Sequence, residues 1–155
     1  MTFNIPNGFS DDLHIWNYIP ERALTASEVD FILKVGKEFA SQWQVHGSPL
    51  KAEVIVQDKV LLSVIVDNDM ATASGCSIDR SVAFVQQLEK ELGVVFLNRM
   101  KLLYSSNEEI HIGDHRELEN LPQNAVVFNH LSTDKASYIA EWLPAKSSWL
   151  APQLG

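Results

Sequence analysis

The sequence predicts an α+β protein built on a ferredoxin-like βαββαβ antiparallel sheet with both main helices on one face, plus a C-terminal β-α extension. Three observations lead to this prediction. Strand-like and helix-like patterns follow one another in the order β-α-β-β-α-β up to residue 105. Two of the strand-like runs meet directly at residues 57–59, which indicates a hairpin. Right-handed crossovers then place both helices on the same face of the sheet.

We expect the 155 residues to form a single domain, because a chain of this length buries a core without disulfides or a metal. Residues 1–12 contain turn-forming residues without periodicity and predict a loose N-terminal arm. Residues 13–105 make the predicted βαββαβ core, and residues 106–155 make the C-terminal extension.

The first strand and the first helix have the clearest local signals. Residues 13–19 alternate apolar and polar side chains and predict a strand. Thr25, followed three residues later by Glu28, has the spacing of a capping box and predicts where the first helix begins. Apolar residues recur at helical spacing from there to Trp43, so we expect the helix to end near Gly47.

The rest of the predicted core follows the same logic. Residues 51–57 and 59–67 predict two antiparallel strands, and the second of them is apolar enough to be a central strand. Residues 78–92 carry an apolar stripe at helical spacing that ends before Gly93, which predicts the second helix. Residues 100–106 predict the last strand of the core.

The C-terminal extension is predicted as a series of short elements. A turn at residues 106–109 leads to a strand, a short helix, a second strand, a helix opened by Ser132 or Thr133, and a tail pinned by Trp149. The corresponding ranges are 110–112, 114–121, 125–130, 132–142 and 143–155.

Composition excludes several classes of partner. The formal charge is −8 and no basic cluster is present, which argues against nucleic acid. A single cysteine cannot form an internal disulfide, residues 1–9 lack the features of a signal peptide, and no apolar run approaches a membrane span. We therefore expect a cytoplasmic protein without membrane insertion.

Metal and nucleotide sites are not predicted. His111 and His115 are four residues apart, but Gly113 follows a strand-like segment, so the two rings are expected to point in different directions. No cofactor is expected. The one Gly-Lys pair, Gly36-Lys37, lies inside the first predicted helix and is not part of a phosphate-binding loop, so we expect no ATPase activity.

The predicted topology brings the end of the first helix, the end of the third strand and the start of the second helix to one end of the molecule. His46, Asp67 and Cys76 lie at these three points. Cys76 is a candidate nucleophile or redox sensor, because free N–H groups at a helix N-terminus stabilise a thiolate, and His46 is its candidate base. The candidate binding residues are Ser74, Gly75, Ser77, Asp79 and Asp67.

The same segment also has a purely structural interpretation. Ser74 or Ser77 fits the N-cap position, and Asp79 in the first turn complements the helix dipole. Gly75 permits a tight turn, and a small Cys76 packs well where a turn meets a core. Both interpretations stay open at the level of the sequence.

Several short motifs together resemble a small bacterial family of similar length. They are Trp43-x-x-His46-Gly47, residues 74–81, Arg99, residues 127–129 and Ser148-Trp149. The family is often catalogued as "ABC transporter ATPase" while functionally uncharacterised, and the resemblance spans residues 16–149. It implies a transporter-associated ATPase, but it transfers no catalytic residue. His130 stands where the resemblance leads us to expect a second asparagine.

Three hypotheses about function follow. The first is a domain that binds a small ligand or a protein partner and has no ATPase activity of its own. The second is a thiol-dependent enzyme or redox sensor that uses Cys76 with His46. The third is the transporter-associated ATPase that the resemblance implies.

Overall fold

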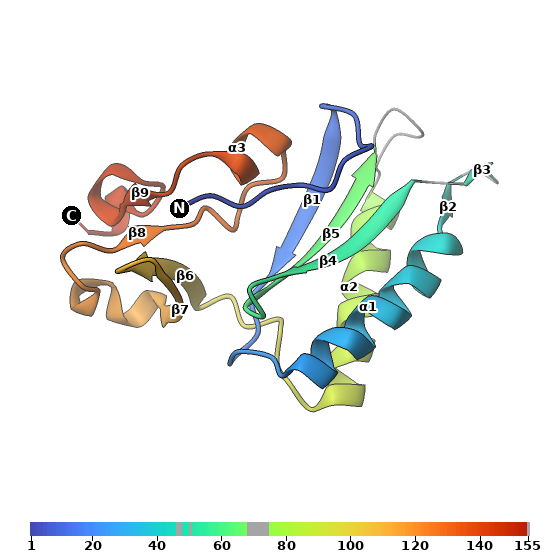
Figure 1. Cartoon of the computed structure of the whole chain (residues 1–155), viewed down its shortest axis with the longest axis horizontal. Helices are drawn as coiled ribbons and strands as arrows, with labels where there is room; N and C mark the ends of the chain where they lie inside the picture. The colour runs from blue at the N-terminus through green and yellow to red at the C-terminus, as the bar shows by residue number, and fades with distance from the viewer. Residues whose placement is uncertain (46–47, 50, 68–74, 155) are drawn as a thin grey trace.

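The computed structural model describes residues 1–45, 48–49, 51–67 and 75–154 (Figure 1). The α-helices are α1 (Ala26–Ser41), α2 (Gly75–Leu92) and α3 (Lys135–Ile139). The strands are β1 (Leu13–Tyr18), β2 (Gln44–Val45), β3 (Ser48–Pro49), β4 (Ala52–Gln57), β5 (Leu61–Asp67), β6 (Lys101–Ser106), β7 (Glu109–Asp114), β8 (Val126–Val127) and β9 (Leu143–Pro144). Three short 3₁₀ helices are η1 (His115–Asn120), η2 (Ala145–Ser147) and η3 (Ala151–Gln153).

The first sheet has the strand order β1-β5-β4, and both pairings are antiparallel. The predicted pairing of residues 51–57 with residues 59–67 is therefore confirmed. Asp58 and Lys59, with φ angles of 47° and 62°, are the central residues of the turn between the strands, and the Val60 N–H closes this turn by donating to the Gln57 carbonyl at 2.9 Å. β5 is buried along its whole length, as expected of a central strand.

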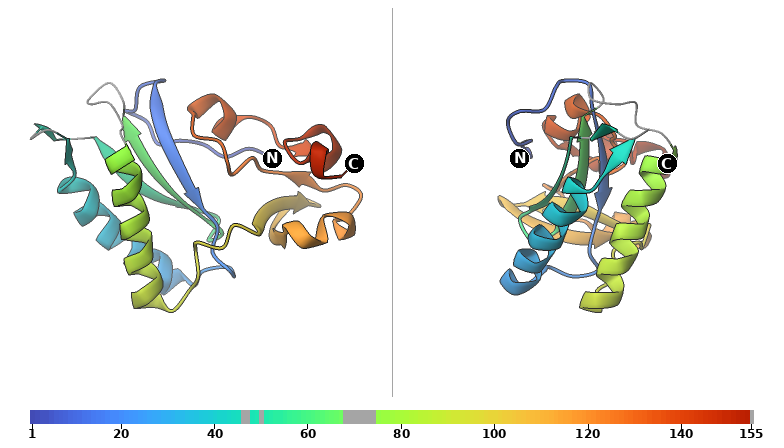
Figure 2. Two further views of the ribbon diagram at one scale, coloured as in Figure 1. Left: turned by 180° about the vertical axis from the view of Figure 1, so that it is seen from behind. Right: turned by 90° about the vertical axis from the view of Figure 1, so that its right-hand side faces the viewer.

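Helices α1 and α2 cover one face of this sheet (Figure 2). Ile32 of α1 and Val85 of α2 pack with Val54 and Val64 of the sheet in one apolar cluster. A Cβ atom on Gly36 would lie 2.7 Å from Cβ of Val54, so glycine lets α1 approach β4 closely. The α+β class with antiparallel sheets is thus confirmed.

A second sheet, with the order β7-β6-β8-β9, lies against the opposite face of the first. Ile15 and Ile65 from the first sheet pack there with Leu103 of β6 and Phe128. β6 was expected to be the fourth strand of the first sheet, but it pairs with β7 and β8 instead. The free side of β1 is occupied by another segment, because the Ile15 N–H donates to the Thr133 carbonyl at 3.0 Å.

Local signals locate the start of α1 and the end of α2, but not the other two helix ends. Helix α2 begins at Gly75, three residues before the predicted start at residue 78. The capping box is present: Glu28 N–H donates to Thr25 Oγ1 at 3.1 Å, and Thr25 N–H donates to Glu28 Oε1 at 2.9 Å. Helix α2 ends before Gly93, which has a φ of 67°. Helix α1, however, ends at Ser41, so the predicted end near Gly47 is wrong, and Trp43 is buried beyond the helix rather than on it.

Two further expectations need correction. The N-terminal segment is not loose, because Phe3 is buried with its ring 5.0 Å from those of both Phe128 and Trp142. Helix α3 is capped by Asp134 instead of Ser132 or Thr133, since Asp134 Oδ1 accepts the Ser137 N–H at 2.8 Å. The tail is held as expected, by Trp149 Nε1 donating to the Phe128 carbonyl at 3.3 Å.

Candidate ligand-binding pocket

The predicted cysteine site lies mostly outside the described residues. This holds for His46 and Ser74, and for the side chains of residues 75–78, which include Cys76. The backbone of Cys76 is in the first turn of α2, and Asp79 is exposed on the same helix. A reactive pair of Cys76 and His46 therefore stays a prediction.

Asp67 is the one buried member of the predicted site whose contacts are described. Its carboxylate accepts hydrogen bonds from Ser10 N–H at 3.0 Å and from Ser10 Oγ at 2.8 Å. These contacts fasten the N-terminal segment to the end of β5. Asp67 thus serves the fold through them, and its end of β5 lies at the same end of the molecule as the start of α2 (Figure 1).

A different place in the structure has the features of a binding site. A pocket of about 470 Å³ lies where the end of β1, helix α2, the segment linking α2 to β6, and the loop after β8 meet. This volume is in the range of small-molecule sites. The lining residues are Asn17, Tyr18, Ile19, Val82, Phe96, Leu97, Asn98, Arg99, Lys101, His130 and Leu131.

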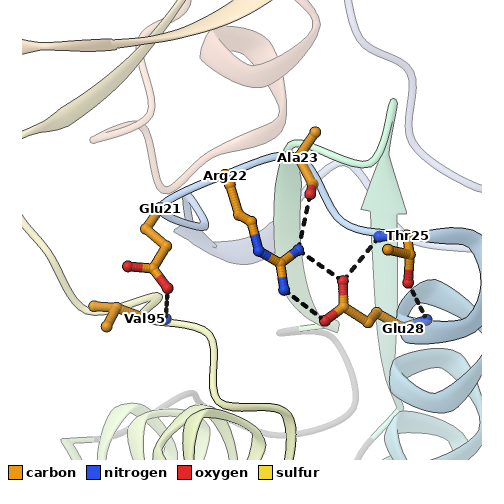
Figure 3. A network of polar contacts seen from close by, with 6 residues as sticks. All are labelled: Glu21, Arg22, Ala23, Thr25, Glu28 and Val95. Atoms are coloured by element: carbon orange, nitrogen blue, oxygen red, sulfur yellow. Dashed lines mark hydrogen bonds and ion pairs between the residues drawn. The ribbon is translucent and has the colours of Figure 1, made fainter.

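The wall between α2 and β6 is fixed by two glutamates. Glu89 Oε2 accepts the N–H groups of Phe96 and Leu97 at 2.7 and 3.0 Å. Glu21 Oε1 accepts the Val95 N–H at 3.2 Å, and the Glu21 N–H donates back to the Val95 carbonyl at 2.8 Å (Figure 3). An irregular segment is thereby held in place, as a preformed binding site requires.

The opposite wall is fixed by Asn17. Its Nδ2 donates to the carbonyls of His130 and Ser132 at 3.1 and 3.2 Å, and its Oδ1 accepts from Ser63 Oγ at 2.7 Å. Asn17 therefore holds the loop after β8 against β1 and has no amide proton left for a ligand.

Tyr18 is held beside it on the other face of β1. Its hydroxyl is 2.5 Å from Oγ of Ser81, a fully buried residue of α2. Burial raises the pKa of Tyr18, and the hydrogen bond with Ser81 opposes this only in part, so the phenol is neutral at pH 7. Tyr18 thus presents ring surface to the pocket.

The charge of the pocket is positive. Arg99 and Lys101 line it, and no acidic residue does so among the residues described. Lys101 Nζ is 4.0 Å from Asp114 Oδ2, but that carboxylate is already bonded by Arg116, whose Nη2 lies 2.6 Å away. Arg116 holds the pKa of Asp114 well below its usual range. In a chain with a net charge of −8, this pocket is a locally cationic place.

His130 adds a neutral imidazole. Burial, together with the smaller effect of the nearby His115, lowers its pKa to about 4. The ring centroid lies 5.0 Å from that of Trp149 and 6.0 Å from that of His115. Its Nδ1 is buried and has no hydrogen-bond partner among the described residues.

The predicted divergence of two histidines agrees with their neighbours. His111 stacks on Tyr104 with 5.1 Å between ring centroids, whereas the His115 ring lies 5.5 Å from that of Trp149. Over the described ranges, no group of three or more His, Cys, Asp or Glu side chains is placed to hold a metal ion. None of the helices in that part of the chain combines the length and apolar character needed to cross a membrane.

Comparisons with protein-family models, with curated proteins and with solved structures find no match for this chain. The resemblance to a bacterial family therefore stays an interpretation of its motifs. The pocket has to be interpreted from its own chemistry.

Sequence reasoning missed this pocket because its walls come from separate parts of the chain. Asn17 and His130 are 113 residues apart in sequence and no periodic pattern links them. Arg99, which is part of the motif resemblance, lines the pocket, and residues 127–129 directly precede its lining residue His130. That spacing alone gave no reason to bring them together.

Proposed function

We propose that this chain is a binding domain for a small organic anion with an apolar body, and that the ligand occupies the pocket lined by Tyr18, Arg99 and His130. The observation that carries the proposal is the combination of two cationic side chains, no lining acid among the described residues, and an apolar floor. The floor consists of Ile19, Val82, Phe96 and Leu97. Leu131, which is 66% exposed, extends this apolar surface at the rim.

The lining residues have three different roles in the proposed binding of the ligand. Arg99 and Lys101 attract and bind the anionic group through their cationic side chains. The neutral His130 ring can donate or accept one hydrogen bond without adding charge. The apolar floor removes the body of the ligand from water, which supplies the non-directional part of the affinity. ATP hydrolysis is not part of this proposal.

A fluorescent probe with the same two chemistries tests the proposal. Anilinonaphthalene sulfonate carries an anionic group on an aromatic body, and we expect saturable binding to the folded protein with one site per chain. Replacing both cations, in Arg99→Gln/Lys101→Gln, should raise its dissociation constant at least about tenfold, equivalent to about 1.4 kcal/mol. The ion pair lost between Lys101 and Asp114 is long and contributes little to stability.

Two controls separate anion recognition from simple hydrophobic binding. Lys90→Gln removes an exposed cation of α2 away from the pocket and should leave the affinity unchanged. Phenylnaphthylamine has the same aromatic body without the sulfonate and should bind the unaltered protein and the double variant equally. Equal affinity of the sulfonate probe for the double variant and the unaltered protein would overturn the proposal.

We further propose that β1, α1, β4, β5 and α2 form a ferredoxin-like unit. Its expected fourth strand, β6, belongs to the second sheet instead. The strand order β1-β5-β4 supports this, because it is the order of the first three strands of such a sheet. Backbone nuclear Overhauser effects should link β1 to residues 130–133. Effects linking β1 to β6 would contradict this arrangement.

A further inference from the structure

The outer edge of β4 carries backbone groups without partners in the described structure. The Asp67 N–H donates to the Lys51 carbonyl at 2.9 Å, which makes Lys51 and Asp67 a hydrogen-bonded pair across β4 and β5. Such pairs alternate along an antiparallel ladder, so Glu53, Ile55 and Gln57 also turn their N–H and C=O groups toward β5. The N–H and C=O groups of Ala52, Val54 and Val56 therefore point away from the sheet.

A groove runs along this edge. It has a volume of about 570 Å³ and lies between α1, the N-terminal segment and the first half of β4. Helix α1 contributes Leu33, Lys37, Ala40 and Ser41, and the N-terminal segment contributes Asn7 and Phe9. The groove shares no lining residue with the pocket described above.

Part of the groove lining is apolar. Leu33 belongs to the apolar repeat of α1 but is 41% exposed, because it faces this groove instead of the core. Ala40 of α1, Phe9 of the N-terminal segment and Val54 of β4 add further apolar side chains to the lining. An exposed apolar side chain beside an unpaired strand edge is the arrangement that proteins use to bind an extended peptide.

Two lysines give the groove its charge. Lys37 lines it from α1 and has no ion-pair partner among the described residues, and Lys51 lies at the start of β4. Lys51 is held over the Phe9 ring, with Nζ 4.7 Å from the ring centroid, and it also donates to the Gly8 carbonyl. Glu53 is the one acid that lines the groove among the residues described. The groove thus favours an acidic partner.

We propose that the β4 edge binds an extended, acidic peptide segment of another protein, which adds as a strand beside β4. Backbone hydrogen bonds to Ala52, Val54 and Val56 supply the common part of the affinity, an apolar side chain packs on Leu33, and an acidic side chain pairs with Lys37. A second copy of this chain is the alternative occupant of this edge, and the test below distinguishes it.

The test uses a fluorescein-labelled, acetylated and amidated peptide that alternates glutamate and valine and is long enough to span β4. Fluorescence anisotropy should show saturable binding. The charge reversal Lys37→Glu should raise the dissociation constant at least about tenfold, because it replaces an attraction with a repulsion. The matched control Lys34→Glu reverses an exposed charge on the same helix outside the groove and should change the affinity less than about twofold.

Backbone pairing has its own readout. In the free protein, the amide protons of Ala52, Val54 and Val56 should exchange fast and those of Glu53 and Ile55 slowly, and the peptide should slow the first set. A peptide with N-methyl groups at alternate positions should not bind. No saturable binding, or equal binding of a peptide with lysine in place of glutamate, would overturn the proposal. A concentration-dependent dimer that protects Ala52, Val54 and Val56 without peptide would overturn it as well.

Discussion

The two edge strands of the first sheet, β1 and β4, differ in whether another segment covers their unpaired backbone groups. Edge strands expose unpaired backbone groups and tend to bind other strands unless something covers them. β1 is covered: its Ile15 N–H bonds the Thr133 carbonyl, and Asn17 bonds the carbonyls of His130 and Ser132. β4 has no such cover in the described structure, and it carries only Lys51 and Glu53 as charged neighbours at its start.

The difference shows how a covered edge becomes a binding pocket. The segment that covers β1 comes from far along the chain, and it brings His130 and Leu131 to the end of the strand. The segment that covers the edge of β1 therefore also forms one wall of the pocket. At β4 the strand edge itself remains as the surface. The two proposed sites therefore differ in kind, because one is a pocket between several segments and the other is a groove along an unpaired strand edge.

The largest expected effect comes from uncovering β1. Asn17→Ala removes three hydrogen bonds and leaves two carbonyls and the buried Ser63 hydroxyl without this partner. We expect the free energy of unfolding to fall by about 3 kcal/mol, measured by urea denaturation. Asn124→Ala is the matched control, because it removes two exposed side-chain hydrogen bonds, and it should cost about 0.5 kcal/mol. Equal losses in the two variants would show that Asn17 does not hold the segment.

The second effect is a dependence of stability on pH at the same covered edge. The pKa of His130 is about 4 in the folded protein and near its ordinary value of 6.5 in the unfolded chain, so the unfolded state binds the proton first. Its neutral form is fully compatible with folding above pH 6.5, and stability is lost as the pH falls from 6.5 toward 4. We expect the unaltered protein to lose about 2 kcal/mol relative to His130→Gln between pH 7.5 and pH 5.

The titration of Glu28 does not obscure this measurement. Arg22 and the Thr25 amide lower the pKa of Glu28 to about 2, so its stabilising contribution is complete above its ordinary value of 4.5 and is lost only below it. Between pH 7.5 and pH 5, the difference in stability between the unaltered protein and His130→Gln therefore reports the titration of His130. Chemical denaturation at each pH, with both proteins, gives the difference. A difference that stays constant with pH would mean that His130 titrates normally in the folded protein.

Local chemistry was predictable from the sequence, and long-range pairing was not. Thr25 and Glu28 are neighbours on one helical turn, and Gly93 ends α2 through its own positive φ, so short windows contain all the relevant information. The hairpin of β4 and β5 is likewise local.

The position of β6 is a different kind of question. Its residues are good strand formers with either partner, and the outcome depends on residues 130–133 taking the free side of β1. For the same reason the sequence predicts a loose arm around Phe3, whose aromatic partners lie beyond residue 127. The candidate pocket could not be predicted from the sequence either, because Asn17 and His130 are brought together only by the tertiary structure.

The smallest expected effect concerns the uncovered edge. Helix α1 forms one wall of the β4 groove, and its first turn is held by the capping box together with Arg22, whose guanidinium donates to both oxygens of Glu28 at 2.9 Å (Figure 3). Thr25→Ala removes the hydrogen bond to the Glu28 N–H. We expect a loss of about 1 kcal/mol in the free energy of unfolding, with Thr25→Ser close to the unaltered protein.

The same variant separates the two edges. Because α1 packs on β4 and lines the groove, Thr25→Ala should weaken binding of the glutamate-valine peptide and speed amide exchange at Val54. It should leave the affinity for anilinonaphthalene sulfonate unchanged, since no residue of α1 lines the pocket at β1. If both probes lost affinity in parallel, the two sites would be coupled through the sheet, and the covered and uncovered edges would no longer count as independent surfaces.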